Sequence, residues 1–362
     1  MRDFKIYFEP QKLDDLRARL KQTRLPRPWE GVQWEHGTST EALGEVLEYW
    51  QSAYDWESRE RELNQIPQYL CEIDQVTLHF LYVKGARPQA QPLLLTHGWP
   101  DSFLRYVKII PYLRDFTLVI PSLPGFAFSG LPPQGYCSNA QTAGLWHKLM
   151  TQVLGYKHYL ASGGDMGRGV SCYLAALYPE EVSALHLTDG GLASELLQAD
   201  PATLSEAERT YRQRAQLWLK EEGAYISVHS TKPQSLSYAL SDSPAGLAAW
   251  LLEKYHAWSE AGLLSPDDLC DCLTLYWLCN CAGTSLRAYY ANAYTLPPLG
   301  RITAPTAFAL FPYDVLPVPE EWLRRHYEVV RLTKMEHGGH FTALEQPEAF
   351  TRDLAQFALE IS

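Results

Sequence analysis

Four short apolar runs between residues 92 and 190 constrain the fold of this chain more than any other feature. They cover residues 92–98, 116–122, 158–164 and 184–190, and each ends in glycine, proline or a polar residue. Near-continuous hydrophobic runs of this length are typical of strands that are buried on both faces of a parallel sheet. Because helical segments separate the runs, the sequence predicts an α/β protein with helices on both faces of a mostly parallel sheet.

The strand pattern stops after Gly191 and resumes only with residues 305–312 and 328–335. Helical, aromatic-rich sequence fills the interval, and a closing helix is expected after Pro347. A parallel sheet interrupted by helices before its last two strands is the layout of the α/β-hydrolase fold. We expect the insertion to form a cap over the carboxyl ends of the strands, where ligands bind in open α/β sheets.

Helices are also expected ahead of the sheet. Leucines recur at helical spacing from Leu13 to Leu20, and a second amphipathic helix is expected from Leu43 to Tyr54. The first strand-like segment is 75–83, where apolar and polar residues alternate. The expected parts are an N-terminal helical meander (1–70), the first part of the hydrolase core (71–190), a helical cap (191–300) and the second part of the core (301–362).

Composition and charge limit the kinds of binding partner and the cellular compartment that we expect for this protein. The formal net charge of −11 argues against nucleic acid or an anionic membrane surface as a partner. The N-terminal residues show no apolar signal segment, and no run approaches the length of a membrane span. Seven cysteines, an odd number without a regular framework, fit a reducing compartment. We expect a cytoplasmic protein without a membrane anchor; its oligomeric state stays open, with a homodimer as one option.

Four of the cysteines crowd one segment, residues 270–281, in the pattern C-x-C…C-x-C. Zinc sites usually have the wider C-x2-C spacing, and the apolar residues in this segment favour a buried helix instead. We expect neither a metal nor another cofactor.

An aspartate lies at the centre of the segment SGGDMGRG, residues 162–169. The segment follows an expected strand and precedes an expected helix, and Asp165 is flanked by Gly163 and Gly167. Hydrolases of this fold place a nucleophile, usually a serine, on such a turn. Taken alone, a glycine-flanked aspartate is most often an ordinary turn residue, because Asp tolerates such conformations.

Two further residues make the catalytic interpretation stronger. Asp314 comes after the penultimate strand and His340 after the last, so that with Asp165 the chain order is nucleophile, acid, histidine, as in this fold. Asp189 ends an earlier strand and is a rival for the acid, although chain order favours Asp314. A non-catalytic binding protein with this fold would not need all three side chains.

A carboxylate nucleophile limits the chemistry. It is already ionised at neutral pH, but its attack on an ester would only exchange acyl groups. It can attack a saturated carbon that carries a strained or good leaving group, and water activated by His340 would then hydrolyse the alkyl ester. The backbone N–H groups of Trp99 and Met166 are expected to form the oxyanion hole of that second step. The pattern therefore indicates epoxide opening or carbon–halogen cleavage.

The chain resembles, nearly end to end, the microsomal-type epoxide hydrolase family, which includes juvenile hormone epoxide hydrolases and soluble bacterial relatives. The triad pattern alone would also fit dehalogenases, whereas the N-terminal meander and the long cap motif are specific. The matching segments are residues 8–26, 49–69, 73–83, 93–113, 121–130, 163–167, 229–258 and 338–348.

The resemblance implies a cofactor-independent enzyme that converts an apolar or bulky epoxide into a vicinal diol. It makes Asp165 the nucleophile, Asp314 the acid that orients the imidazole, and His340 the base. The two tyrosines that donate a proton to the epoxide oxygen map to Tyr225 and Tyr289. For the second of these, the adjacent Tyr290 and the nearby Tyr294 are alternatives.

Two departures from the family pattern bear on the reaction. The family often has tryptophan where Met166 stands, which changes the pocket wall but keeps the backbone N–H. Some relatives have glutamate in place of Asp314, so the shorter side chain requires His340 to come closer.

The alternative function is a haloalkane or haloacid dehalogenase with the same first step. Arg168 only faintly resembles the arginine of the haloacid enzymes, because it is displaced along the elbow.

Overall fold

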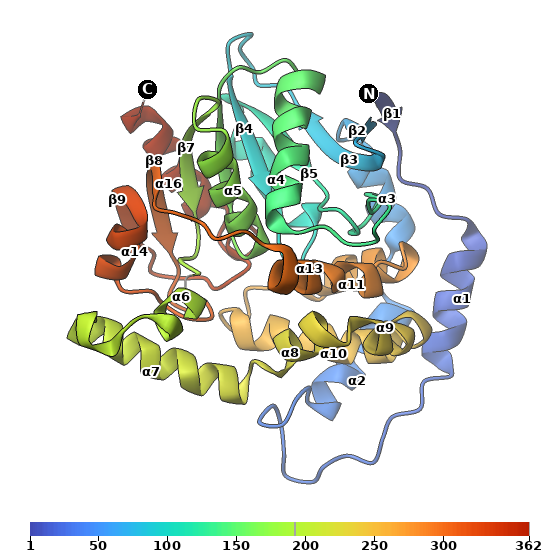
Figure 1. The fold of residues 1–362 in the computed structure, drawn as a ribbon. Coiled ribbons are helices and arrows are strands. Elements are labelled where there is room, and N and C mark those ends of the chain that lie inside the picture. The colour runs from blue at the N-terminus through green and yellow to red at the C-terminus, as the bar shows by residue number, and fades with distance from the viewer. Residues whose placement is uncertain (192, 362) are drawn as a thin grey trace.

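The computed structural model describes residues 1–191 and 193–361, and within them nine strands form a single sheet in the order β1-β2-β3-β5-β4-β6-β7-β8-β9 (Figure 1). Strands β4 to β9 pair in parallel, whereas β1, β2 and β3 form antiparallel pairs and β3 joins β5 antiparallel. The expected mostly parallel sheet is confirmed. The strands are β1 (Arg2–Phe4), β2 (Gln68–Ile73), β3 (Val76–Val83), β4 (Gln91–Thr96), β5 (Phe116–Pro121), β6 (Tyr159–Gly163), β7 (Val182–Leu187), β8 (Ile302–Leu310) and β9 (Tyr327–Lys334).

The expectation that only helices precede residues 75–83 is wrong. Strands β1 and β2 come earlier in the chain, and β2 forms a hairpin with β3. The hairpin turns through Asp74 and Gln75, whose φ angles are +50° and +65°. Hairpin turns of this kind usually contain a glycine, which makes them recognisable in a sequence, but this pair has none.

Helices cover both faces of the sheet, as expected. Alternate residues of β4 enter different hydrophobic clusters, since Leu94 packs in one and Leu93 and Leu95 in the other. Helices α4 (Asn139–Lys148) and α5 (Met166–Leu177) contribute to the first cluster, and η1 (Phe103–Tyr112) and α16 (Pro347–Glu360) to the second. The remaining core elements are η2 (Leu149–Val153), α14 (Glu320–His326) and α15 (Thr342–Glu345).

A helical cap lies below the sheet in Figure 1, at the carboxyl ends of the parallel strands. Its elements are α6 (Ala193–Gln198), η3 (Pro201–Thr203), α7 (Glu206–Glu221), α8 (Ala224–Thr231), α9 (Pro233–Asp242), α10 (Pro244–Trp258), α11 (Pro266–Leu278), α12 (Ala282–Ser285) and α13 (Arg287–Thr295). The cysteine-rich segment does form a buried helix, α11, which buries Cys270 and Cys272 and ends just before Cys279. None of the helices in the described residues has both the length and the hydropathy that crossing a bilayer requires.

The N-terminal helices pack on this cap rather than on the sheet alone. They are α1 (Pro10–Lys21), α2 (Thr40–Ser52) and α3 (Trp56–Leu63). Helices α1 and α2 contact both α10 and α11, and α3 contacts α11. The meander therefore helps to hold the cap in place over the strand ends.

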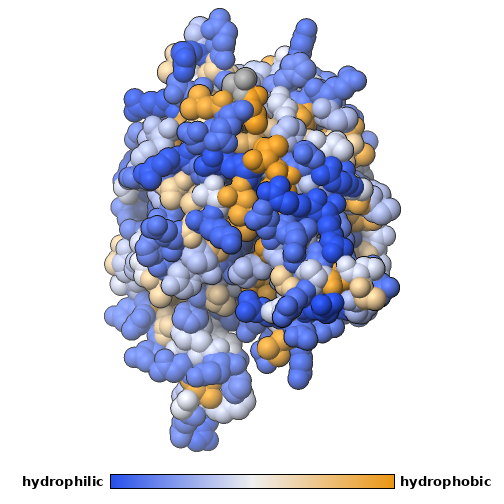
Figure 2. Space-filling model, turned by 90° about the vertical axis from the view of Figure 1, so that its left-hand side faces the viewer, coloured by the Kyte–Doolittle hydropathy of each residue, from blue (hydrophilic) through white to orange (hydrophobic). Residues whose placement is uncertain are grey.

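The sheet ends at β9, which leaves one strand edge uncovered by another strand. Along this edge strand Glu328 and Val330 are exposed, while Arg331 pairs with Asp353 at 2.8 Å and with Glu360 at 2.7 Å on α16. Figure 2, which views this side of the molecule, shows hydrophilic and apolar residues mixed over the surface. Charged side chains on an edge strand disfavour pairing with a second sheet.

Candidate active site

The sharp turn between β6 and α5 places Asp165 at the N-terminus of α5, with a φ angle of +56°. A positive φ is uncommon for a residue other than glycine and requires support from its surroundings. The flanking glycines provide the room, since a Cβ on Gly167 would lie 1.9 Å from the Thr96 carbonyl oxygen. A Cβ on Gly163 would lie 2.5 Å from the carbonyl carbon of Gly167. The expected strand, elbow and helix are confirmed.

Hydrogen bonds keep the Asp165 carboxylate ionised. Its Oδ1 accepts a hydrogen bond of 2.9 Å from the backbone N–H of Trp99, and its Oδ2 lies 3.6 Å from Nε2 of His340. Burial alone would raise the pKa of Asp165, but His340 and the backbone N–H groups of Trp99 and Met166 outweigh it and lower the pKa. The side chain therefore carries a negative charge at neutral pH.

His340 lies between two carboxylates. Its Nδ1 is 2.7 Å from Oδ1 of Asp314, and its buried Nε2 faces Asp165 without a hydrogen-bond partner within bonding distance among the described residues. Burial would lower the pKa of His340, but Asp314 and Asp165 raise it to about 10. The histidine is therefore an imidazolium while Asp165 is charged.

Asp189, the rival acid, contacts a different part of the site. Its Oδ2 accepts the backbone N–H of Asp165 at 2.6 Å, and its Oδ1 pairs with Nε of Arg168 at 2.9 Å. Asp189 therefore stabilises the backbone of the elbow at Asp165, while Asp314 contacts the imidazole of His340.

Two tyrosines from the cap lie together above the elbow. The ring of Tyr225, from α8, stacks on Trp99 with centroids 5.4 Å apart, and Tyr289, from α13, lies 5.9 Å from both rings. Burial raises the pKa of both phenols, so both hold their protons at neutral pH. Tyr290 is 37% exposed and contacts Tyr136 and Tyr294 instead.

Known proteins are similar to this chain over nearly its full length. A family model of the epoxide hydrolase N terminus matches residues 1–106, and one of the α/β hydrolase fold matches residues 91–252. Epoxide hydrolase 1 of Oryctolagus cuniculus is 32% identical over 99% of this chain and 88% of its own length. Juvenile hormone epoxide hydrolase of Manduca sexta is 34% identical over 99% of this chain and 86% of its own. The chain belongs to the epoxide hydrolase family.

The structural comparison agrees with this membership. The solved structure of Aspergillus niger epoxide hydrolase matches with a TM-score of 0.90 at 31% identity, over 100% of this chain and 96% of that chain. The fold and the family that the sequence indicated are therefore both confirmed.

This epoxide hydrolase family member has a cavity of about 180 Å³ at the carboxyl ends of the strands. The residues that line it are Asp165, Arg168, Asp189, Gly191, Tyr225, Trp258, Asp314, Val315, Leu316 and His340. Trp258 and Leu316 were not among the predicted site residues. Trp258 ends the cap segment that resembles the family, where no role was predicted for it, and Leu316 lies in a loop without a motif. Among the described residues, no group of three or more His, Cys, Asp or Glu side chains is arranged to hold a metal ion.

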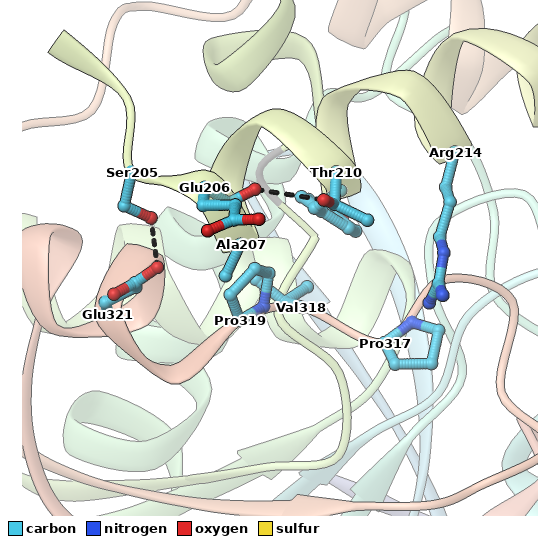
Figure 3. Close-up of a pocket in the computed structure, with 10 residues that line it drawn as sticks. Ser205, Glu206, Ala207, Thr210, Arg214, Pro317, Val318, Pro319 and Glu321 are labelled. Carbon is cyan, nitrogen blue, oxygen red and sulfur yellow. Dashed lines mark hydrogen bonds between the residues drawn. The ribbon is translucent and has the colours of Figure 1, made fainter.

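A larger hollow of about 640 Å³ lies beside this cavity, between α7 and the loop that leads into α14 (Figure 3). Arg214, Pro317 and Val318 line it, and Ser205 donates a hydrogen bond to Glu321 across one end. It contains none of the five residues predicted to act in catalysis, so the smaller cavity is the candidate active site.

Proposed function

We propose that the protein hydrolyses apolar or bulky epoxides to vicinal diols through an alkyl ester on Asp165. The observation that carries this proposal is the carboxylate at the elbow, with one oxygen on the N–H of Trp99 and the other facing His340. An ionised carboxylate is a nucleophile for a strained carbon without further activation.

In the first step an oxygen of Asp165 bonds to one epoxide carbon while the bond from that carbon to the epoxide oxygen breaks. Tyr225 and Tyr289 donate hydrogen bonds to the leaving oxygen, and one of them gives it a proton. The imidazolium of His340 supplies a proton to replace the one lost by the tyrosine. His340 then stays neutral, because the ester no longer carries the Asp165 charge that favoured its protonated form.

In the second step neutral His340 takes a proton from water, and the hydroxide attacks the carbonyl carbon of the Asp165 ester. The backbone N–H groups of Trp99 and Met166 stabilise the oxyanion that forms. The ester bond breaks, the diol oxygen takes the proton held by His340, and Asp165 is left as a carboxylic acid. The acid passes its proton to His340, which restores the carboxylate and the imidazolium of the starting state. Asp314 keeps Nδ1 of His340 protonated and directs Nε2 toward the water.

The two buried phenols favour an epoxide over a haloalkane as substrate. An epoxide oxygen leaves as an alkoxide and needs a proton, whereas a halide leaves as a stable anion and needs none. Tyr225, from α8, lines the cavity that holds Asp165, and the ring of Tyr289, from α13, lies 5.9 Å from the ring of Tyr225, which supports the two phenols as the proton donors.

We also propose that the protein works in the cytoplasm, with a homodimer as one option for its oligomeric state. All seven cysteines are free thiols and six of them are buried, which suits a reducing compartment. Cell fractionation and light scattering test these two points.

A single turnover in heavy-oxygen water tests the proposed mechanism. With enzyme in excess over a styrene-type epoxide, the first diol should contain no solvent oxygen, and mass spectrometry should find the label in the peptide that holds Asp165. Solvent oxygen in the first diol would contradict the ester mechanism. Chloride release from haloalkanes with no diol from epoxides would favour the dehalogenase alternative.

A further inference from the structure

The buried carboxylate of Glu345, which is not among the predicted catalytic residues, accepts hydrogen bonds from the residues on both sides of His340. Glu345, in α15, accepts the backbone N–H of Phe341 on Oε1 and that of Gly339 on Oε2, each at 2.9 Å. These are the two residues on either side of His340 in the chain. Glu345 is only 6% exposed.

The same carboxylate reaches the cap. Oε2 of Glu345 also accepts the backbone N–H of Glu260 at 2.9 Å, just after the end of α10. The side chain of Glu260 in turn accepts the N–H of Gly338 at 2.6 Å and lies 3.0 Å from Nδ1 of His337. Three backbone N–H groups from two separate segments therefore converge on one side chain.

The backbone of His340 itself is held at both of its polar groups. Its N–H donates to the carbonyl oxygen of Trp258 at 2.7 Å, and its carbonyl oxygen accepts from the Arg105 guanidinium. The backbone at Gly339 packs closely against the backbone at Trp258, as an added Cβ on Gly339 would lie only 2.3 Å from the Trp258 carbonyl oxygen. The loop of the histidine is thus fixed against the end of α10, and Glu345 secures both sides of that contact.

We propose that Glu345 is a positioning residue for the hydrolytic half of the reaction, which holds Nε2 of His340 at the place where it must activate water. This role rests on the proposed function. Glu345 should affect the second step more than the first. In the first step His340 only returns a proton to the tyrosine after the epoxide has opened, whereas in the second step its Nε2 must activate the attacking water.

The charge of Glu345 matters as well as its size. A carboxylate offers only acceptors, so it can satisfy all three N–H groups at once, and bonds to an ionised acceptor are the stronger kind. Glutamine has the same shape, but its NH₂ group would meet at least one backbone N–H as a second donor. The loop must then shift, and a displacement of about 1 Å at a reacting group can cost roughly 100-fold in rate.

Single-turnover kinetics of Glu345→Gln test this role. We expect formation of the Asp165 ester to stay within about threefold of the wild-type rate, and its hydrolysis to slow by roughly 10- to 100-fold. The ester should therefore accumulate, and acid quenching followed by mass spectrometry of the Asp165 peptide should detect it. Stopped-flow tryptophan fluorescence can follow both steps, since Trp99 and Trp258 lie at the site.

Two variants complete the experiment. Glu348→Gln changes an exposed glutamate three residues further along and should leave both steps unchanged. Glu345→Asp keeps the charge but shortens the reach, so hydrolysis should again slow more than ester formation, which preserves the test if Glu345→Gln does not fold. Equal slowing of both steps, or no slowing, in the folded variants would overturn the positioning role. Failure of the wild-type enzyme to form any ester would overturn the proposed function and this role with it.

Discussion

Neighbouring side chains on a helix point about 100° apart, so a single residue of offset decides which one enters the active site. On α13, Tyr289 faces Trp99, Tyr225 and His229, whereas Tyr290 is turned to the surface next to Tyr136. The geometry therefore assigns the second proton donor to Tyr289 in the mechanism proposed above.

Removing one phenolic hydroxyl at a time tests this assignment. Tyr289→Phe should lower the rate of ester formation by roughly 10²- to 10⁴-fold, because the leaving oxygen loses a proton donor. Tyr290→Phe should stay within about twofold of the wild-type rate, and it provides the matched control. The measurement is the single-turnover rate of Asp165 ester formation. A comparable loss in both variants would contradict the assignment.

Asp165, Asp314 and His340 could be predicted because each follows a strand, and chain order links these strands to one edge of the sheet. Tyr225 and Tyr289 lie in cap helices and were predicted only from the resemblance to the family. The residues that support the catalytic backbone could not be predicted. Asp189 and Glu345 act through backbone N–H groups of Asp165, Gly339, Phe341 and Glu260. Such contacts leave no spacing pattern, and Glu345 does not match a capping box, because it follows the N-cap Phe341 by four residues and that N-cap is not a Ser, Thr, Asp or Asn.

At the scale of elements, the elbow between β6 and α5 depends on contacts that allow no side chain. Gly167→Ala would place a methyl group 1.9 Å from the Thr96 carbonyl oxygen on β4. The clash is between backbone segments of the buried core, so no flexible side chain can move to relieve it. We therefore expect a loss of at least about 2–3 kcal/mol in the free energy of unfolding and no detectable diol formation.

A glycine in an ordinary helix provides the comparison for that variant. Gly44 lies within α2, and an added Cβ would meet no heavy atom within 4 Å. Gly44→Ala should therefore stabilise the protein by about 0.5–1 kcal/mol and leave activity unchanged. Urea unfolding and diol formation are the measurements. A Gly167→Ala variant as stable and active as the wild type would show that the elbow can relax.

Elements whose burial is complete were the easiest to predict. The strands β4 to β8 coincide with the predicted apolar runs to within three residues at their starts, because both of their faces are covered. Strand β1 has only three residues and gains its hydrogen bonds from β2, which in turn pairs with β3. Strands β1 and β2 depend on pairing with other strands and on a turn without glycine, so their own sequence contains no pattern that predicts them.

At the scale of the whole molecule, side chains from the N-terminal meander tie it to the cap. Arg59, on α3, pairs with Asp271, on α11, at 2.6 Å, and the Tyr54 hydroxyl donates to the same carboxylate at 2.7 Å. Trp50 donates its indole N–H to Thr274 at 2.7 Å. These pairs join residues more than 200 positions apart, such as the 212 between Arg59 and Asp271, and no local pattern predicts them.

The pair of Arg59 and Asp271 should contribute to the stability of the whole molecule in a pH-dependent way. Burial raises the pKa of Asp271 to about 6, and the charge of Arg59 opposes a further rise. In Arg59→Ala the carboxyl loses its counter-ion and takes up a proton more readily, which limits the loss to about 1–3 kcal/mol at neutral pH.

The sign of the pH effect follows from the raised pKa. A carboxyl whose pKa is higher in the folded state than in the unfolded state favours folding when protonated, and this contribution is lost as pH rises through the folded pKa. The deficit of Arg59→Ala relative to the wild type should therefore be larger at about pH 8 than at about pH 5, as measured by urea unfolding. Arg87→Ala is the control, because its pair with Asp115 is 73% and 71% exposed and should cost less than about 0.5 kcal/mol at either pH. An equal deficit at both pH values would mean that Arg59 holds the cap by packing alone, since groups that titrate alike in the variant and the wild type cancel in the difference and leave the charge of Asp271.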